Sequence, residues 1–187
     1  MPRILTLSFL SLSLAALLSL ASVTEARAAR CYNISQFEAE QGLRIHSELM
    51  VISLTCQRIP GHAGLYDKYQ QFTQKNRILL ADYENRLISY YKSNGSAAPS
   101  KQLHTLRTDL ANEISQHAVS MSVTSFCSHF SSRIDRALSM DRDTLQRWAR
   151  QVWPDQKTTA PLCRQDEETL RAAALQRQNP QRTTIRR

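Results

Sequence analysis

Apolar residues recur at three- and four-residue intervals along most of the chain, and no long stretch alternates strictly between apolar and polar positions. This spacing is typical of helices that bury one face. The sequence contains only four glycines, so few residues interrupt such helices. The pattern predicts an all-α protein, arranged as an up-down-up-down bundle of about four helices.

The first predicted helix runs from Ser35 to about Cys56 and ends before Pro60. Ser35 and Glu38 match a capping box, in which each side chain satisfies a free backbone amide at the helix start. Apolar residues occupy most of the circumference, which favours a central position in the bundle. The remaining charged positions lie four residues apart and predict a charged stripe of Glu40, Arg44 and Glu48.

The second predicted helix covers about 66–92. Its apolar seam carries Asn76 where the next apolar residue is due. This Asn could bind a ligand, but we favour a role in setting the register of helix packing.

The last two predicted helices cover about 100–136 and 141–152. The longer one has a weak point over 120–132, because the Ser and Thr side chains there compete for backbone hydrogen bonds. The shorter one stops at Pro154, which cannot continue a helix.

The first 29 residues have the pattern of a secretory signal peptide. A positive start at Arg3 and an apolar run over 4–23 lead to small residues around Ala28 and Ala29. We therefore expect cleavage after one of these alanines and a periplasmic or secreted protein. An uncleaved membrane anchor is the alternative, although serines interrupt the apolar run. No transmembrane segment is expected after cleavage.

The rest of the chain divides into a helical domain over 30–163 and a tail over 164–187. The tail is rich in Arg, Gln, Asn and Thr, and we expect it to be mostly disordered beyond a short helical start. The whole chain carries a formal charge of +8 at pH 7, of which the leader contributes one unit. This charge favours an anionic partner.

Four cysteines follow the leader, and an even number in an exported chain predicts two disulfides. A helix from Ser35 to Cys56 is about 30 Å long, whereas a disulfide needs Cα atoms within about 7 Å, so Cys31 should not pair with Cys56. In the predicted bundle the C-termini of the first and third helices lie at the same end, so Cys56 lies beside Cys127. This arrangement predicts the pairs Cys56–Cys127 and Cys31–Cys163.

A His-x3-Met-x5-Cys pattern occurs before both Cys56 and Cys127. A His and a Met four residues apart share one helix face, and two such pairs side by side could hold Cu(I). Core packing is the favoured interpretation, because Met commonly fills protein interiors. The candidate metal ligands are His46, Met50, His117 and Met121.

Known catalytic motifs are absent from the sequence. It has no His-Glu-x-x-His, no Gly-x-Ser-x-Gly and no glycine-rich phosphate loop. Glu113 and His117 are one residue too far apart for the Glu-x-x-His of di-iron bundles. We expect no cofactor, and an enzyme of unknown type is the third hypothesis for the function.

The fourth predicted helix and its end combine arginines with tryptophan. Charge and aromatic contacts of this kind could engage anionic envelope polymers or lipid headgroups. The alternative is that the tryptophans belong to the core and the arginines to an ordinary solvated face. Nucleic acid would require a similar surface, but export disfavours it. The candidate contact residues are Arg142, Arg147, Arg150 and Trp153.

The leading hypothesis is therefore a non-enzymatic periplasmic module that contacts an anionic envelope component, and a periplasmic copper-binding protein is the alternative.

Two stretches carry a resemblance: 48–51 leading to Cys56, and 110–116 leading to Cys127. They resemble small exported helical proteins of unknown function from Gram-negative bacteria, over roughly 31–127. The resemblance implies a periplasmic setting and assigns no catalytic residue.

Overall fold

The computed structural model describes residues 31–152 and 158–178. The predicted leader 1–29 lies outside the described residues. The described part is all-helical and contains two disulfides, and its only bridge pairing joins Tyr32 to Leu162. Within these residues, no helix is both long and apolar enough to cross a membrane.

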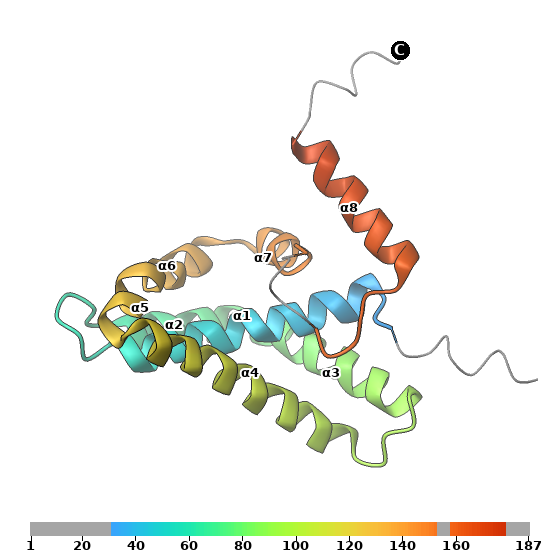
Figure 1. The fold of residues 1–187 in the computed structure, drawn as a ribbon, viewed down its shortest axis with the longest axis horizontal. Coiled ribbons are helices and arrows are strands. Elements are labelled where there is room, and N and C mark those ends of the chain that lie inside the picture. Colours follow the sequence, from blue (N-terminus) through green and yellow to red (C-terminus); the bar gives the residue numbers. More distant parts are fainter. Residues whose placement is uncertain (1–30, 153–157, 179–187) are drawn as a thin grey trace, which may run out of the picture. The chain divides into compact units, whose positions relative to one another are not determined.

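Helix α1, Ile34–Cys56, is the central element of the fold (Figure 1). It contacts every other helix from α2 to α8 that the next paragraphs introduce. As a result it is buried on almost all sides, and its apolar side chains form the middle of the core. The predicted central position of this helix agrees with the structure.

The start of α1 differs from the predicted capping box. Asn33, not Ser35, is the N-cap, and its side chain accepts a hydrogen bond from the Gln36 amide at 2.9 Å. The Gln36 side chain accepts one from the Asn33 amide at 2.9 Å, which completes the box. Glu38 is therefore released from capping, and its side chain is fully buried in the protein.

The predicted charged stripe on this helix lies inside the protein and not on its surface. Glu40 and Arg44 are buried, and the Glu48 side chain is only 16% exposed. Helices pack around α1 on all sides, so these charged groups find their partners inside the protein. Periodicity placed them on one side of the helix but carried no information about what covers that side.

The second predicted helix is broken into α2, Leu65–Lys75, and α3, Arg77–Ser93. The break lies at Asn76, which is buried and whose side-chain Nδ2 donates to the Phe72 carbonyl at 2.9 Å. The Asn76 side chain thus donates a hydrogen bond to a backbone carbonyl at the break, which is a structural role.

The third predicted helix is divided at its Ser/Thr-rich segment, as expected. Helix α4 spans Pro99–Met121, α5 spans Val123–Phe130 and α6 spans Ser132–Ser139. Ser122 separates the first two with a φ of 68°, a conformation that non-glycine residues rarely adopt. The fourth predicted helix is present as α7, Arg142–Ala149, with Asp141 as its N-cap.

The two disulfides join the pairs of cysteines expected from the helix geometry. Cys56 at the end of α1 is bonded to Cys127 in α5, with Cα atoms 5.5 Å apart. Cys31 is bonded to Cys163, with Cα atoms 5.0 Å apart. Each bond closes a long loop and is expected to stabilise the fold by about 2–4 kcal/mol.

Helix α8, Arg164–Gln178, occupies much of the tail that was expected to be mostly disordered. Asp166 and Glu167 in its first turn suit the positive end of the helix dipole. Glu167 also forms an i,i+4 ion pair with Arg171, and Leu170 packs against the core. The composition of the tail gave no indication of these contacts, which stabilise the helix. Residues 179–187 lie outside the described part.

Gly42 provides a test of the packing around α1. A Cβ atom at this position would overlap the ring of Tyr83 on α3. We expect Gly42→Ala to lower the free energy of unfolding by about 1–3 kcal/mol through overpacking, although Ala favours a helix by about 1 kcal/mol over Gly. Urea denaturation followed by circular dichroism measures this change.

The control is the same substitution in a Tyr83→Leu background. There the ring is gone, and Gly42→Ala should be neutral or stabilising. An equal loss of stability in both backgrounds would show that the ring contact is not the cause.

Candidate anion-binding site

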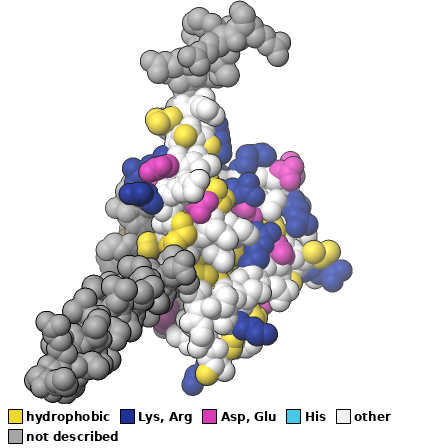
Figure 2. Space-filling view, turned by 90° about the vertical axis from the view of Figure 1, so that its right-hand side faces the viewer, with side chains coloured by type: hydrophobic (Ala, Val, Ile, Leu, Met, Phe, Trp, Pro, Cys, Tyr) yellow, Lys and Arg dark blue, Asp and Glu magenta, His cyan; other side chains and the backbone are white. Residues whose placement is uncertain are grey.

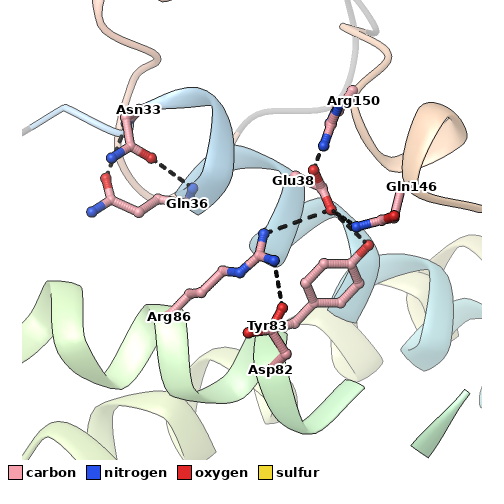
Figure 3. Close-up of polar contacts among 8 residues, drawn as sticks. All are labelled: Asn33, Gln36, Glu38, Asp82, Tyr83, Arg86, Gln146 and Arg150. Atoms are coloured by element: carbon pink, nitrogen blue, oxygen red, sulfur yellow. Dashed lines mark hydrogen bonds and ion pairs between the residues drawn. The ribbon is translucent and has the colours of Figure 1, made fainter. Parts of the chain in front are cut away.

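Glu38 lies at the centre of a buried polar cluster that joins three helices (Figure 3). Its carboxylate accepts hydrogen bonds from Tyr83 Oη at 3.1 Å, Gln146 Nε2 at 3.0 Å and Arg150 Nε at 2.5 Å. Arg86 adds an ion pair at 3.6 Å. A fully buried carboxylate needs such a set of partners, because burying an unpaired charge is very unfavourable.

Tyr83 remains a donor in this cluster at all ordinary pH values. Burial is the largest cause that raises the pKa of Tyr83, and the adjacent Glu38 carboxylate raises it further. The phenol is therefore protonated and able to donate. The cluster holds α3 and α7 against α1, so we assign it a structural role.

The Glu40 carboxylate is held by neutral donors. Its carboxylate accepts a hydrogen bond from Tyr32 Oη at 2.8 Å and from both the amide and the hydroxyl of Thr159, the amide at 2.8 Å. Burial, and next to it the negative charge of Glu40, raise the pKa of Tyr32. Together with the Cys31–Cys163 bond, these contacts attach the segment before α8 to the start of α1.

A cavity of about 150 Å³ lies between α1, α6 and α7. Two ion pairs border it: Arg44 Nη1 lies 2.9 Å from Glu113 Oε1 on α4, and Arg133 on α6 is bonded to Glu48. Burial raises the pKa of Glu48, while Arg133 acts in the opposite direction. The cavity is lined by Gln41, Arg44, Ile45, Glu48, Arg133, Arg136 and Trp148.

The predicted surface residues on α7 are in different situations. Arg142 and Arg147 are exposed, and Arg147 Nη2 donates to the Thr144 hydroxyl at 2.7 Å. Arg150 is partly exposed but its Nε is bonded to Glu38. Trp153 lies outside the described residues.

Sequence reasoning missed the cavity residues of α1 and α6. Gln41, Arg44 and Glu48 do follow three- and four-residue spacing, which places them on one side of α1. In the sequence this spacing predicts only a charged stripe of Glu40, Arg44 and Glu48 and does not assign these residues to a site. Arg133 and Arg136 join them only because the chain turns back after α5.

The candidate copper ligands do not share one environment. His46 is 7% exposed, and its Nε2 lies 3.1 Å from Tyr69 Oη and 3.2 Å from Thr73 Oγ1. Met50 is half-buried against the core, whereas His117 and Met121 are exposed on α4. In 31–152 and 158–178 there is no group of three or more His, Cys, Asp or Glu side chains that could hold a metal ion.

Lys and Arg side chains are prominent on the face of the molecule shown in Figure 2, with Asp and Glu side chains among them. The cavity and the exposed arginines of α7 offer guanidinium and amide donors. Such groups bind carboxylate or phosphate oxygens. The arrangement is therefore suited chemically to anion binding.

Comparison with known proteins adds no assignment. No family model, no curated protein and no solved structure matches this chain.

Glu38 provides a test of the buried cluster. We expect Glu38→Ala to lower the free energy of unfolding by about 3–5 kcal/mol, because breaking a buried pair leaves its partners uncompensated. Chemical denaturation at pH 7 measures the loss. The matched control is Glu84→Ala, which removes a partly exposed ion pair with Arg107 and should cost about 0–1 kcal/mol. Equal losses in the two variants would contradict the structural role.

His46 provides a test of pH dependence. Burial, with the charge of Arg107 as a smaller cause, lowers the pKa of His46 from 6.5 to about 4. Because the folded pKa lies below the unfolded one, the neutral ring stabilises the fold above about pH 6.5. This stability, about 3 kcal/mol, is lost as pH falls toward 4.

The measurement is urea denaturation at pH 7 and pH 4.5 for the wild type and two variants. His46→Gln should lose less stability than the wild type between these pH values. His117→Gln, which changes an exposed ring, should follow the wild-type profile. Identical profiles for all three proteins would show that His46 titrates normally.

Proposed function

We propose that this protein is a non-enzymatic, exported module that binds an anionic component of the cell envelope, a polymer or lipid headgroups. The contact is made by the arginines of α7 on an up-down-up-down helical scaffold. One observation carries the proposal: Arg142 and Arg147 are exposed, and neither forms an ion pair within the described residues. Their charges are thus available to a partner.

The inward placement of carboxylates supports this proposal. Glu38 and Glu40 are fully buried, so a partner at the surface does not contact these carboxylates directly. The chain as a whole carries +8. A surplus of exposed positive charge attracts anionic polymers and membranes and accelerates association with them.

The two disulfides fit an extracellular protein, because such bonds persist in oxidising compartments. Export through the predicted leader would place the protein in the periplasm or outside the cell. Anionic lipid headgroups and anionic wall polymers both occur there.

The test is binding of the full mature chain to sedimented vesicles of phosphatidylglycerol and phosphatidylcholine, and to isolated cell-wall polymer. Each arginine near an anionic surface contributes about 1 kcal/mol. We therefore expect Arg142→Gln with Arg147→Gln to weaken binding by roughly 30-fold, since 1.4 kcal/mol corresponds to tenfold. Added salt should weaken the wild type more than the variant.

The matched control is Lys92→Gln with Lys101→Gln, which removes the same charge from the α3–α4 turn (Figure 1). This control should retain most of the binding. Equal weakening in both double variants would indicate attraction by net charge alone, and no binding by the wild type to either material would contradict the proposal.

A further inference from the structure

We propose that the cavity between α1, α6 and α7 binds the carboxylate group of a small organic acid. Its volume of about 150 Å³ suits a compact ligand, since a cavity of about this size accommodates a molecule such as benzene. The cavity is separate from the exposed arginines Arg142 and Arg147. The inference goes beyond the envelope contact and does not depend on it.

Gln41 supplies the observation that points to a ligand. Its side chain lines the cavity and is 3% exposed, and its Nε2 has no hydrogen-bond partner among the described residues. Native proteins rarely leave a buried amide donor without an acceptor, because the donor loses its hydrogen bonds to water. An acceptor oxygen bound in the cavity would satisfy this N–H group.

The charged groups of the lining favour an anion as the source of that oxygen. Three guanidinium groups line the cavity against the single carboxylate of Glu48. Arg44 and Arg133 already have carboxylate partners, but Arg136 forms no ion pair in the part of the chain that the structure describes. A guanidinium group matches a planar carboxylate with two parallel hydrogen bonds.

The apolar part of the lining defines the rest of the ligand. Ile45 is buried and Trp148 is half-buried, so a short alkyl chain can contact both. A monoanion suits the site better than a dianion, because Glu48 would repel a second negative charge. These features favour a short-chain carboxylate over inorganic phosphate. The same carboxylate chemistry occurs in a free acid and at the C-terminus of a peptide.

The experiment titrates the full mature chain carrying Trp153→Phe, so that Trp148 is its only tryptophan. Fluorescence and the indole N–H resonance report binding of butyrate, acetate, N-acetylalanine, phosphate and butyramide. We expect saturable binding of butyrate with a Kd on the order of millimolar or tighter, as is usual for so small a ligand. Acetate should bind less tightly, and neutral butyramide at least about 10-fold less tightly. Tighter binding of N-acetylalanine than of butyrate would support a peptide as the source of the carboxylate.

Three variants separate ligand binding from a structural role. Gln41→Met removes the donor at similar volume, and Arg136→Gln removes the unpaired charge; each should weaken butyrate binding about 10-fold or more. Glu48→Gln should tighten binding several-fold, because it removes repulsion and releases Arg133. Gln41→Met should not lower the thermal midpoint of the ligand-free protein, since it removes a buried donor that has no partner. If Gln41→Met does not fold, the exposed Arg136→Gln and the tightening by Glu48→Gln still decide the question.

Arg142→Gln is the matched control, because it changes an arginine outside the cavity and should leave butyrate binding unchanged. Four results would overturn the inference: no saturable binding of any carboxylate, equal binding of butyrate and butyramide, tighter binding of phosphate than of butyrate, or no effect of the cavity variants. Vesicle binding by Arg142 and Arg147 is measured separately, so either proposal can fail while the other holds.

Discussion

The burial of the Glu38 carboxylate is the constraint on which much of the structure depends. A buried charge of this kind requires donors from several directions, and α3 and α7 supply them through Tyr83, Gln146 and Arg150. Because these donors come from helices far apart in sequence, satisfying the charge fixes how the helices pack on α1. Apolar packing alone tolerates shifts in position better than a network that must satisfy every polar atom.

The same principle extends along α1. Glu40 attaches the segment before α8, and Arg44 pairs with Glu113 on α4, while Glu48 pairs with Arg133 on α6. Each charged residue of the central helix thus contacts a different part of the chain. The disulfides reinforce this arrangement, one at the end of α1 and the other just before its start.

The polar interior also has a chemical consequence. Where the partners of α1 are complete, as at Glu38, the polar group stabilises the fold. Beside Gln41 the set is incomplete, and the neighbouring space is a cavity whose charged lining groups are three guanidiniums and one carboxylate. A structural network and a ligand site therefore use the same helix, and they differ in whether the protein itself supplies the last partner.

Several features of this protein were determined by local sequence. Three- and four-residue spacing of apolar residues, with few glycines, specified helices, and the Ser/Thr-rich segment marked a place where a helix breaks. The length of the first helix restricted the cysteine pairing, because covalent geometry forbids a disulfide across 30 Å. These features follow from the chain itself and from rules that act over a few residues.

Only the tertiary structure decided which polar residues are inside. In the sequence, Glu38 looks like a capping residue, and Glu40, Arg44 and Glu48 form a charged stripe. Periodicity reports which side of a helix a residue occupies but not what covers that side. Burial of these groups depends on donors such as Arg150 and Thr159, more than 100 residues away. The cavity likewise exists only where α6 and α7 return to α1. Contacts between distant segments fixed the candidate site, and no pattern within one helix could specify them.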